Sequence, residues 1–454
     1  MKKIYNDASV SVFPKEIAKE KIPAIVVQLL NGASVSMNHH NKKDLVCVTF
    51  DAQEYLIHTN DFINAKTIAE NIWASYVEAN CLQNSYQIIS HTLEIHKRAY
   101  NQTCNIYEKR FKGKTNVIFV KGDKSGCGYW RMILPASYID NDYMVDVTNV
   151  EVLYEYLLEY DVIVLQRTLN WESLYVIKKL QKLGKKVVYD IDDNLFELPD
   201  HNPSKKKYDI DALRAVSTII STVDRVTVTT QRLKQKLIKF IGKEITDKIF
   251  IIPNAINMSK YPERSFDKEE PFRIVWSGSA THEVDFMQCL KGLDDFMKNH
   301  KDDDVRIFFF GFCPICVKEI LNQEHWQKRI EYVKFQDVET YFELIGEVKA
   351  DVAIIPLALD DFNIAKSNIK WIEFSMASIP CVISKVPPYS DSINDNEAIL
   401  VERDGWLGAL EDKFATREDE KWTQYVSNSR KKINEYYNIE NKKVINLWNK
   451  VLTF

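Results

Sequence analysis

Short apolar segments alternate with amphipathic stretches along the chain from Thr115 onward. This alternation is typical of parallel strands whose two faces are both covered by helices. A first series of apolar segments lies at residues 116–120, 161–166, 186–190, 225–229 and 248–252. A second series lies at residues 272–278, 305–311, 351–357, 380–384 and 398–402. Stretches of helical periodicity separate them, as at 171–184 and 286–300. The pattern therefore predicts an α/β protein with two lobes.

The first 112 residues have a different pattern. An apolar segment at 22–30 precedes mixed strand-like pieces, and a long helical stretch is predicted from about Asn64 to Glu108. We interpret residues 1–112 as a separate α+β module without a chemical signature. The two lobes are expected to cover residues 113–255 and 256–436. The final helix, within residues 437–454, is expected to pack back on the first lobe.

Composition and charge narrow the class of protein. A chain of 454 residues with 45% hydrophobic content can bury two or three cores. Its 60 basic and 64 acidic residues give a net charge of -4, so charge does not indicate binding to nucleic acid or to an anionic membrane. A local basic patch remains compatible with this balance.

The termini and cysteines bear on the compartment. The amino terminus has no apolar core of a secretory signal, and no apolar run approaches the roughly 20 residues that span a bilayer. Eight cysteines scattered through so long a chain favour reduced thiols over a disulfide framework. We therefore expect a cytoplasmic protein with no transmembrane segment.

The segment 362–391 is the richest in candidate chemistry. It follows an apolar strand with a polar loop that opens a helix, where backbone N–H groups and the helix dipole converge on an anion. In this loop Lys366 could neutralise a diphosphate, and Ser367 and Asn368 could cap the helix or donate to phosphoryl oxygens. Further along the helix, the Glu373 carboxylate could accept hydrogen bonds from a ribose.

This segment resembles the helix-strand unit of the retaining glycosyltransferases with the two-lobed GT-B fold, which include sucrose and trehalose synthases and bacterial glycan mannosyltransferases. The resemblance covers roughly residues 115–450 and is most specific between Lys366 and Ser384. It implies two Rossmann-like lobes facing across a cleft, with the nucleotide-sugar donor in the second lobe. Glu373 matches the second glutamate of the family's Glu-x7-Glu motif, which holds the donor ribose. Ala365 occupies the place of the first glutamate, so the chain is a divergent member.

A second candidate donor loop spans residues 276–285. Gly278 permits close backbone approach, and Ser279 offers a hydroxyl beside the start of the next helix. The resembling family commonly has Gly-Arg-Leu here with a lysine nearby. Because both cations are absent, His282 becomes a candidate contact to the diphosphate, with helix capping as the alternative.

A glycine-containing loop at residues 122–131 follows the first strand of the first lobe. Its glycine spacing does not match the dinucleotide-binding fingerprint, which disfavours a Rossmann dehydrogenase. In the resembling family this loop faces the cleft. The resemblance implies that Gly126, Gly128 and Arg131 contact donor phosphate or acceptor, with a surface cation as the alternative for Arg131.

Acidic residues and an arginine follow two other strands of the first lobe. Asp190, Asp192 and Asp193 form a cluster that could be read as a metal-binding motif with hard oxygen ligands. The two-lobed pattern argues against that interpretation. We assign Asp192 and Asp193 an acceptor-side or structural role and Asp190 a structural one. Arg167 is expected near the same edge, as a cleft contact or in a buried ion pair.

No metal or cofactor is predicted. Cys313 and Cys316 have the spacing of metal ligands, but no second pair of ligands lies at a suitable distance in the sequence, so we interpret them as core-facing thiols.

We therefore predict a glycosyltransferase that moves a sugar from a nucleoside diphosphate sugar to an acceptor, with retention implied by the resemblance. Lys366, Glu373, Arg131 and Asp192 are the candidate catalytic residues. A sugar-nucleotide epimerase of the same fold and an inactive nucleotide-sugar-binding scaffold are the alternatives. A glycan, a protein, a lipid-linked sugar or a modified DNA base is compatible as acceptor.

Overall fold

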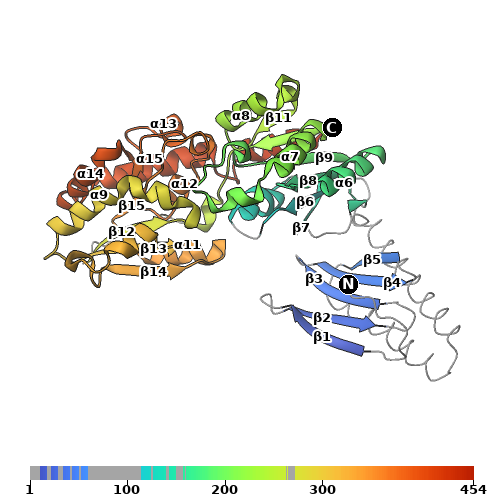
Figure 1. The fold of residues 1–454 in the computed structure, drawn as a ribbon, viewed down its shortest axis with the longest axis horizontal. Helices are drawn as coiled ribbons and strands as arrows, with labels where there is room; N and C mark the ends of the chain where they lie inside the picture. Colours follow the sequence, from blue (N-terminus) through green and yellow to red (C-terminus); the bar gives the residue numbers. More distant parts are fainter. Residues whose placement is uncertain are drawn as a thin grey trace. The chain divides into compact units, whose positions relative to one another are not determined.

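A computed structural model describes residues 114–454, apart from 124–125, 140–142, 150–156, 159, 262 and 264–270. Before residue 114 it describes the backbone of five strands, β1 (Ser11–Ile17), β2 (Ile22–Gln28), β3 (Ser34–His40), β4 (Lys43–Phe50) and β5 (Gln53–Thr59). These strands form an antiparallel sheet in sequential order (Figure 1). The helical stretch predicted from about Asn64 to Glu108 lies outside the described residues.

The sheet of the first lobe has the strand order β11-β10-β9-β8-β6-β7. Its strands are β6 (Thr115–Lys121), β7 (Tyr143–Asn149), β8 (Val162–Gln166), β9 (Lys186–Asp190), β10 (Arg225–Val228) and β11 (Ile249–Ile251). Strands β8 to β11 pair in parallel. Its main helices are α6 (Trp171–Lys182), α7 (Ile210–Thr222) and α8 (Gln231–Ile241). Because β8 is buried along its whole length, the apolar run of its sequence follows from burial on both faces.

The second lobe is a doubly wound sheet with the order β14-β13-β12-β15-β16-β17. Its strands, all parallel, are β12 (Phe272–Ser277), β13 (Val305–Gly311), β14 (Ile330–Lys334), β15 (Val352–Ile355), β16 (Cys381–Ser384) and β17 (Ile399–Val401). The chain leaves the central strand β12 for β13 on one side and later returns to β15 on the other. Ligands of such sheets bind beyond the carboxyl ends of the strands at this reversal.

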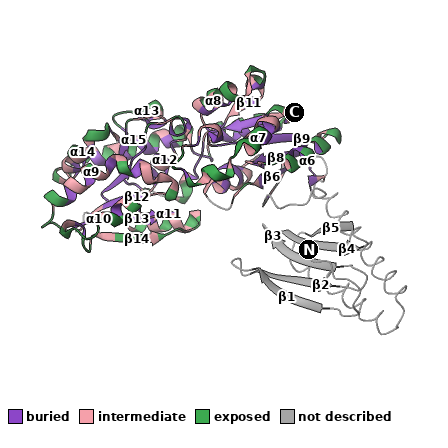
Figure 2. Ribbon diagram, in the orientation of Figure 1, coloured by how far each residue is buried: buried purple, intermediate pink, exposed green. Residues whose placement is uncertain are grey.

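Helices of the second lobe pack against this sheet around a core of buried aromatic and aliphatic side chains (Figure 2). They are α9 (Glu283–Asn299), α10 (Ile315–Ile320), α11 (Val338–Glu347), α12 (Ile369–Met376), α13 (Tyr389–Ser392) and α14 (Trp406–Ala415). Trp276, Phe286 and Phe309 meet edge to face within this core. This core contains side chains of β12 and β15, and it therefore fixes the positions of the two strands from which the site loops begin.

Two helices end the chain, α15 (Glu420–Tyr436) and α16 (Lys442–Leu452). The last helix lies against the first lobe. The Trp448 ring meets Phe119 of β6 edge to face, with ring centroids 5.3 Å apart. Arg225 of β10 donates from Nη1 to the carbonyl oxygens of Lys450 and Thr453, at 2.8 and 2.6 Å. The carboxyl-terminal helix therefore packs on the first lobe, although it follows the second lobe in the sequence.

All ten strands predicted in the two lobes are present, whereas β7 and β14 were not predicted. Both lie at an edge of their sheet. The sequence of β14, Ile-Glu-Tyr-Val-Lys, has no continuous apolar run because none of its side chains is fully buried. An edge strand carries a weaker hydrophobic signal than a central one for this reason.

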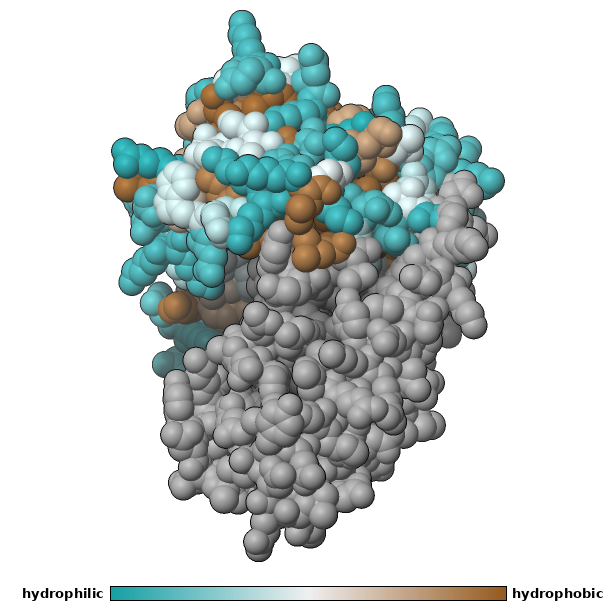
Figure 3. All heavy atoms as spheres, turned by 90° about the vertical axis from the view of Figure 1, so that its right-hand side faces the viewer, coloured by the Kyte–Doolittle hydropathy of each residue, from teal (hydrophilic) through white to brown (hydrophobic). Residues whose placement is uncertain are grey.

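The described surface is mixed in character. On the face shown in Figure 3, hydrophobic side chains form several separate patches among hydrophilic ones, as on most protein surfaces. No helix in the described part of the chain is both long and apolar enough to cross a membrane.

Candidate functional site

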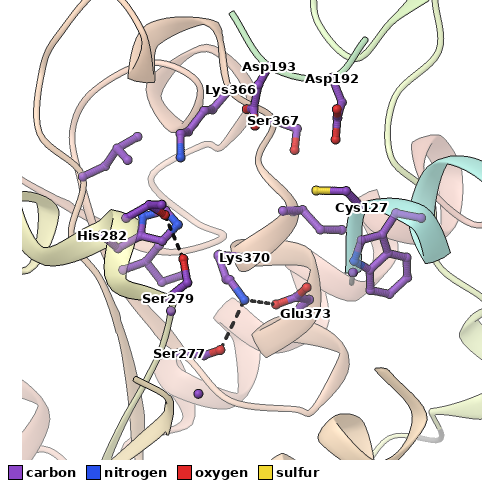
Figure 4. Close-up of a pocket in the computed structure, with 18 of the residues that line it drawn as sticks. Cys127, Asp192, Asp193, Ser277, Ser279, His282, Lys366, Ser367, Lys370 and Glu373 are labelled. Atoms are coloured by element: carbon purple, nitrogen blue, oxygen red, sulfur yellow. Dashed lines mark hydrogen bonds and ion pairs between the residues drawn. The ribbon is translucent and has the colours of Figure 1, made fainter. Parts of the chain in front are cut away.

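A cavity of about 490 Å³ is lined by residues of both lobes. Its volume lies in the range of small-molecule sites. Arg167 lines it from the first lobe. Cys127 and Asp192 of the first lobe and His282 and Lys366 of the second also line it (Figure 4). The cleft expected between the two lobes is thus present, and candidate residues from both lobes line it.

The cavity residues named above lie in connecting segments, and each segment follows a strand of one of the two sheets. Arg167 comes directly after β8, Asp192 after β9 and Gly278 after β12, while Lys366 lies in the longer loop between β15 and α12. Loops at the carboxyl ends of parallel strands meet at one edge of a sheet. The topology therefore gathers residues that are far apart in the sequence.

Glu373 lies on α12 as a buried carboxylate, only 5% exposed. Its Oε2 accepts hydrogen bonds from Lys370 Nζ at 2.7 Å and from the Tyr341 hydroxyl at 3.2 Å. Burial raises the pKa of Tyr341 well above its usual value, and the Glu373 charge adds to the rise, so the phenol stays a donor. Within the described part of the chain no hydrogen bond to Oε1 is made, which leaves this oxygen to accept from a ligand.

Lys366 differs from Lys370 in having no ion-pair partner among the described residues. Its ammonium lies 4.8 Å from the centre of the Phe362 ring, and Figure 4 shows it directed toward the same space as Lys370 and His282. The next residue, Ser367, accepts a hydrogen bond at Oγ from Asn254 Nδ2 of the first lobe, at 2.9 Å. Lys366 thus places a positive charge where the loop leads into α12.

Asn368 differs from its expected position, because it does not line the cavity. It is the residue before the first turn of α12, and its side-chain amide donates to Ser392 Oγ and to the Tyr437 hydroxyl, at 3.1 and 3.0 Å. These contacts turn the side chain toward α13 and α15. The side chain of Asn368 therefore holds the start of the helix instead of facing a ligand.

His282 forms a dyad with Asp285 at the start of α9. The Asp285 carboxylate lies 2.7 Å from His282 Nδ1 and also accepts from the Ala358 N–H and from Asn363 Nδ2, at 2.9 and 2.8 Å. Because a carboxylate only accepts, Nδ1 carries a proton and Nε2 is left for the cavity. Burial lowers the pKa of His282, and the positive charge of Lys366 lowers it further.

The neighbouring Gly278 lines the cavity and fits its loop closely. A Cβ atom at this position would lie 2.5 Å from the ring of Trp276. Ser279 lines the cavity too, and its Oγ lies 2.8 Å from the Thr281 hydroxyl. Both residues therefore occupy the place that the sequence predicted for them.

In the first lobe, Arg167 binds both predicted carboxylates. Its Nη2 lies 3.0 Å from Asp193 Oδ2, and its Nε donates to Asp192. Burial by itself raises the pKa of Asp192, but the Arg167 charge and hydrogen bond outweigh it, so the pKa is lowered and the carboxylate is ionised. Arg167 has a left-handed backbone, with φ of 49°, a strained conformation for a non-glycine residue that is common at functional sites.

Cys127 also lies beside Arg167, with Sγ 3.5 Å from its Nη2. Burial raises the pKa of Cys127 well above its usual value, and the negative charge of Asp192 raises it further. The thiol is therefore neutral and is not an activated nucleophile.

Arg131 does not reach the cavity, contrary to prediction. It lies in a π-helical turn, η2 (Tyr129–Ile133), and is only 1% exposed. Its Nη2 lies 2.7 Å from Asp190 Oδ2, and its Nη1 donates to the Ile252 carbonyl at 2.7 Å. Asp190 is thus paired within the core, in the structural place that the sequence assigned to it. Arg131 is buried because its guanidinium forms an ion pair with the buried carboxylate of Asp190, at the end of β9.

The two glycines of this loop have different positions. Gly126 lines the cavity, whereas Gly128 is buried and packs against Asp123. A Cβ atom at Gly128 would lie 2.3 Å from the Asp123 carbonyl oxygen. The predicted ligand contact of Gly128 is therefore wrong, and close packing accounts for the glycine.

The sequence reasoning missed several residues that line the cavity. Lys370 is one of two lysines among them, with Lys334, and Tyr341, Tyr208 and Asn254 are others. Lys370 lies three residues before Glu373 on α12, a spacing that places side chains on one face of a helix. That spacing was the available signal.

No three His, Cys, Asp or Glu side chains in the described ranges lie close enough together to hold a metal ion. Cys313 and Cys316 pack against the core of the second lobe, as expected of structural thiols. In the first lobe, the carboxylates of Asp192 and Asp193 both pair with the single guanidinium of Arg167.

No protein-family model and no curated protein matches the sequence. Solved structures are similar in fold. One is an alpha-glucosyltransferase in complex with UDP and a 13-mer DNA containing a HMU base, with a TM-score of 0.55 and 11% identity, covering 75% of this chain and 100% of that one. Another is a glycosyltransferase from Rickettsia africae, with a TM-score of 0.54 and 13% identity over 75% of this chain and 99% of that one. A third is Anabaena HepE in complex with UDP-glucose, with a TM-score of 0.53 and 13% identity over 74% of this chain and 100% of that one.

These likenesses, together with the two parallel sheets, show that the chain has the two-lobed fold that the sequence predicted.

Proposed function

We propose that this chain, which has the GT-B fold, is a glycosyltransferase that transfers a sugar from a nucleoside diphosphate sugar to an acceptor. One observation carries the proposal. At the strand-order reversal of the second lobe, Lys366, which has no ion-pair partner among the residues that the structure describes, and the buried carboxylate Glu373 line one cavity. Structures of similar fold hold UDP or UDP-glucose, and these ligands present a diphosphate and a ribose.

The residues suit the two ends of such a donor. Glu373 would accept hydrogen bonds from the ribose hydroxyls at Oε1. Lys366 would neutralise the diphosphate as the glycosidic bond breaks, together with the backbone N–H of Ser367. His282 would contact the same group through Nε2, as a donor only when the imidazole is protonated.

The proposed stereochemistry is retention, which rests on the resemblance of the 362–391 segment to retaining enzymes. In a front-face mechanism the departing phosphate takes the proton of the acceptor, so no separate protein base is required. The acceptor would enter beside Arg167, Asp192 and Asp193. The five cysteines whose side chains are described are unpaired, which favours a reducing compartment and a cytoplasmic location.

A donor screen tests the proposal. UDP, GDP and ADP and their sugars are added to the full chain, and thermal unfolding is followed. At least one nucleoside diphosphate is expected to raise the melting temperature, because a ligand that binds only the folded state stabilises it. The Glu373→Gln variant should lose this rise. Absence of any rise in the wild type would contradict donor binding.

Analysis of products separates the alternatives. Candidate glycans, proteins, lipid-linked sugars and DNA are offered with the bound donor, and the anomeric configuration of the product is determined by NMR. Release of the free nucleoside diphosphate with a new glycosidic bond supports transfer. An epimerised donor without an acceptor would indicate an epimerase, and binding without conversion would indicate a scaffold.

Catalysis is expected to need no divalent metal. The acidic residues that line the cavity from the first lobe, Asp192 and Asp193, share an ion pair with Arg167, and Lys366 provides the positive charge at the proposed phosphate position. Turnover should therefore survive EDTA within about twofold. Complete loss in EDTA, with rescue by Mn²⁺, would reassign the two carboxylates as metal ligands.

A further inference from the structure

Lys370 lies between two parts of the proposed donor site. Its Nζ is 2.7 Å from Glu373 Oε2 and 3.2 Å from Ser277 Oγ, at the end of β12 (Figure 4). Glu373 is the proposed ribose acceptor, and Ser277 begins the loop that carries Gly278 and His282. The ammonium group therefore joins the ribose end of the cavity to the loop proposed to contact phosphate.

The pair with Glu373 has a clear electrostatic reason in the empty site. A carboxylate that is 5% exposed loses most of its hydration, and an unpaired buried charge is strongly destabilising. Lys370 compensates that charge, and its own side chain stays 27% exposed. The flexible stem of a lysine allows its ammonium to move to another anion nearby.

We propose that Lys370 is a second cation for the donor diphosphate, and that its ion pair with Glu373 is the arrangement of the site before the donor binds. On binding, the diphosphate takes the ammonium, and the ribose hydroxyls replace it as hydrogen-bond donors to Glu373. Each charged group then exchanges one hydrogen-bond partner for another, so neither is left without a hydrogen bond. This inference rests on the proposed function.

If Lys370 moves from Glu373 to the diphosphate, its loss should affect two ligands differently, whereas a fixed ion pair would affect both alike. If Lys370 contacts phosphate, its removal weakens binding of a nucleoside diphosphate but not of the nucleoside, which has no phosphate. If Lys370 only compensates the charge of Glu373, its removal disturbs the ribose contact and weakens both ligands by the same factor. The ratio of the two affinities therefore distinguishes the two roles.

The test uses the full chain with Lys370→Met, titrated with UDP and, by displacement, with uridine. We expect UDP to bind about 10- to 100-fold more weakly, the effect of losing a hydrogen bond to a charged group. Uridine should bind within about threefold of wild type. Glu373→Gln should instead weaken UDP and uridine by similar factors, because both carry the ribose.

Further variants keep the test interpretable. Lys370→Gln retains a hydrogen-bond donor for Glu373 but no charge, so it should show the same selective loss even if Lys370→Met folds poorly. Lys291→Met is the matched control, because Lys291 forms a helical ion pair with Asp295 at 2.5 Å outside the cavity. It should leave both affinities unchanged.

The outcomes separate this inference from the proposed function. Equal weakening of UDP and uridine in both Lys370 variants, or no weakening of UDP, would overturn the role of Lys370 and leave donor binding intact. If wild type binds none of UDP, ADP and GDP, the proposed function fails and this inference fails with it.

Discussion

Replacing Lys366 with alanine is expected to lower turnover by about two to three orders of magnitude. The physical reason is that negative charge accumulates on the diphosphate as the sugar leaves. The Lys366 ammonium, which lies in the cavity, stabilises that charge more strongly in the transition state than in the bound donor. Donor affinity should fall much less than turnover. The measurement is steady-state kinetics with the donor identified by the screen, together with a direct binding titration.

Two variants give this prediction its controls. Lys366→Arg keeps the charge with another shape and should retain more activity than alanine. Lys385→Ala removes a lysine of the same lobe whose side chain is 54% exposed and lies outside the cavity, and should be neutral. Unchanged turnover in Lys366→Ala, or a loss confined to donor affinity, would show that Lys366 does not act on the leaving group.

Replacing Arg131 with methionine is expected to destabilise the protein by about 3–5 kcal/mol. The change removes the partner of Asp190, whose side chain is fully buried, and two further hydrogen bonds of the guanidinium, to the Ile252 carbonyl and Asn254. Burial raises the pKa of the Asp190 carboxyl, and Arg131 opposes that rise. Urea unfolding of the full chain measures the loss.

The pH dependence of this loss follows from the sign of the pKa change. Without Arg131 the pKa of Asp190 rises further in the folded state, while in the unfolded chain it stays near about 3.9. A raised pKa costs stability as pH increases, because the unfolded state ionises first. The loss relative to wild type should therefore be larger at pH 8 than at pH 5.

The double variant Arg131→Met/Asp190→Asn should recover part of the stability, because it leaves no unpaired charge. Arg306→Met is the surface control. Arg306 pairs with Asp304 and Glu331 while its side chain is 40% exposed, and its loss should stay within about 1 kcal/mol. A similar small effect for Arg131→Met would contradict the structural role assigned to the buried pair.

The core strands and the donor loop could be predicted from the sequence for one physical reason. A central parallel strand is buried on both faces, so it must be a nearly continuous apolar run, as in β8 and β15. Polar residues directly after such a run lie at the functional edge of the sheet. Arg167, Asp192 and Gly278, which follow strands in this way, line one cavity together with Lys366 of the longer loop after β15.

The sequence could not decide which polar residues face the ligand, because that depends on partners brought together by folding. Arg131 and Arg167 are both arginines near the carboxyl end of a first-lobe strand. Asp190 draws Arg131 into the core, whereas Asp192 and Asp193 hold Arg167 at the cavity. The local sequence shows which side chains are present, but it does not show which residues far along the chain they pair with.

The same limit applies to α12. The resemblance pointed to Glu373, but the pairing of Glu373 with Lys370, Tyr341 and the β12 loop requires the second lobe to be assembled. Asn368 was equally unpredictable, since its partner Tyr437 lies far along the chain. The sequence by itself thus determined the two lobes and the edge where the site lies. Only the tertiary structure decided which side chains at that edge can bind a ligand. The other side chains already form hydrogen bonds or ion pairs within the protein, with partners that folding brings close.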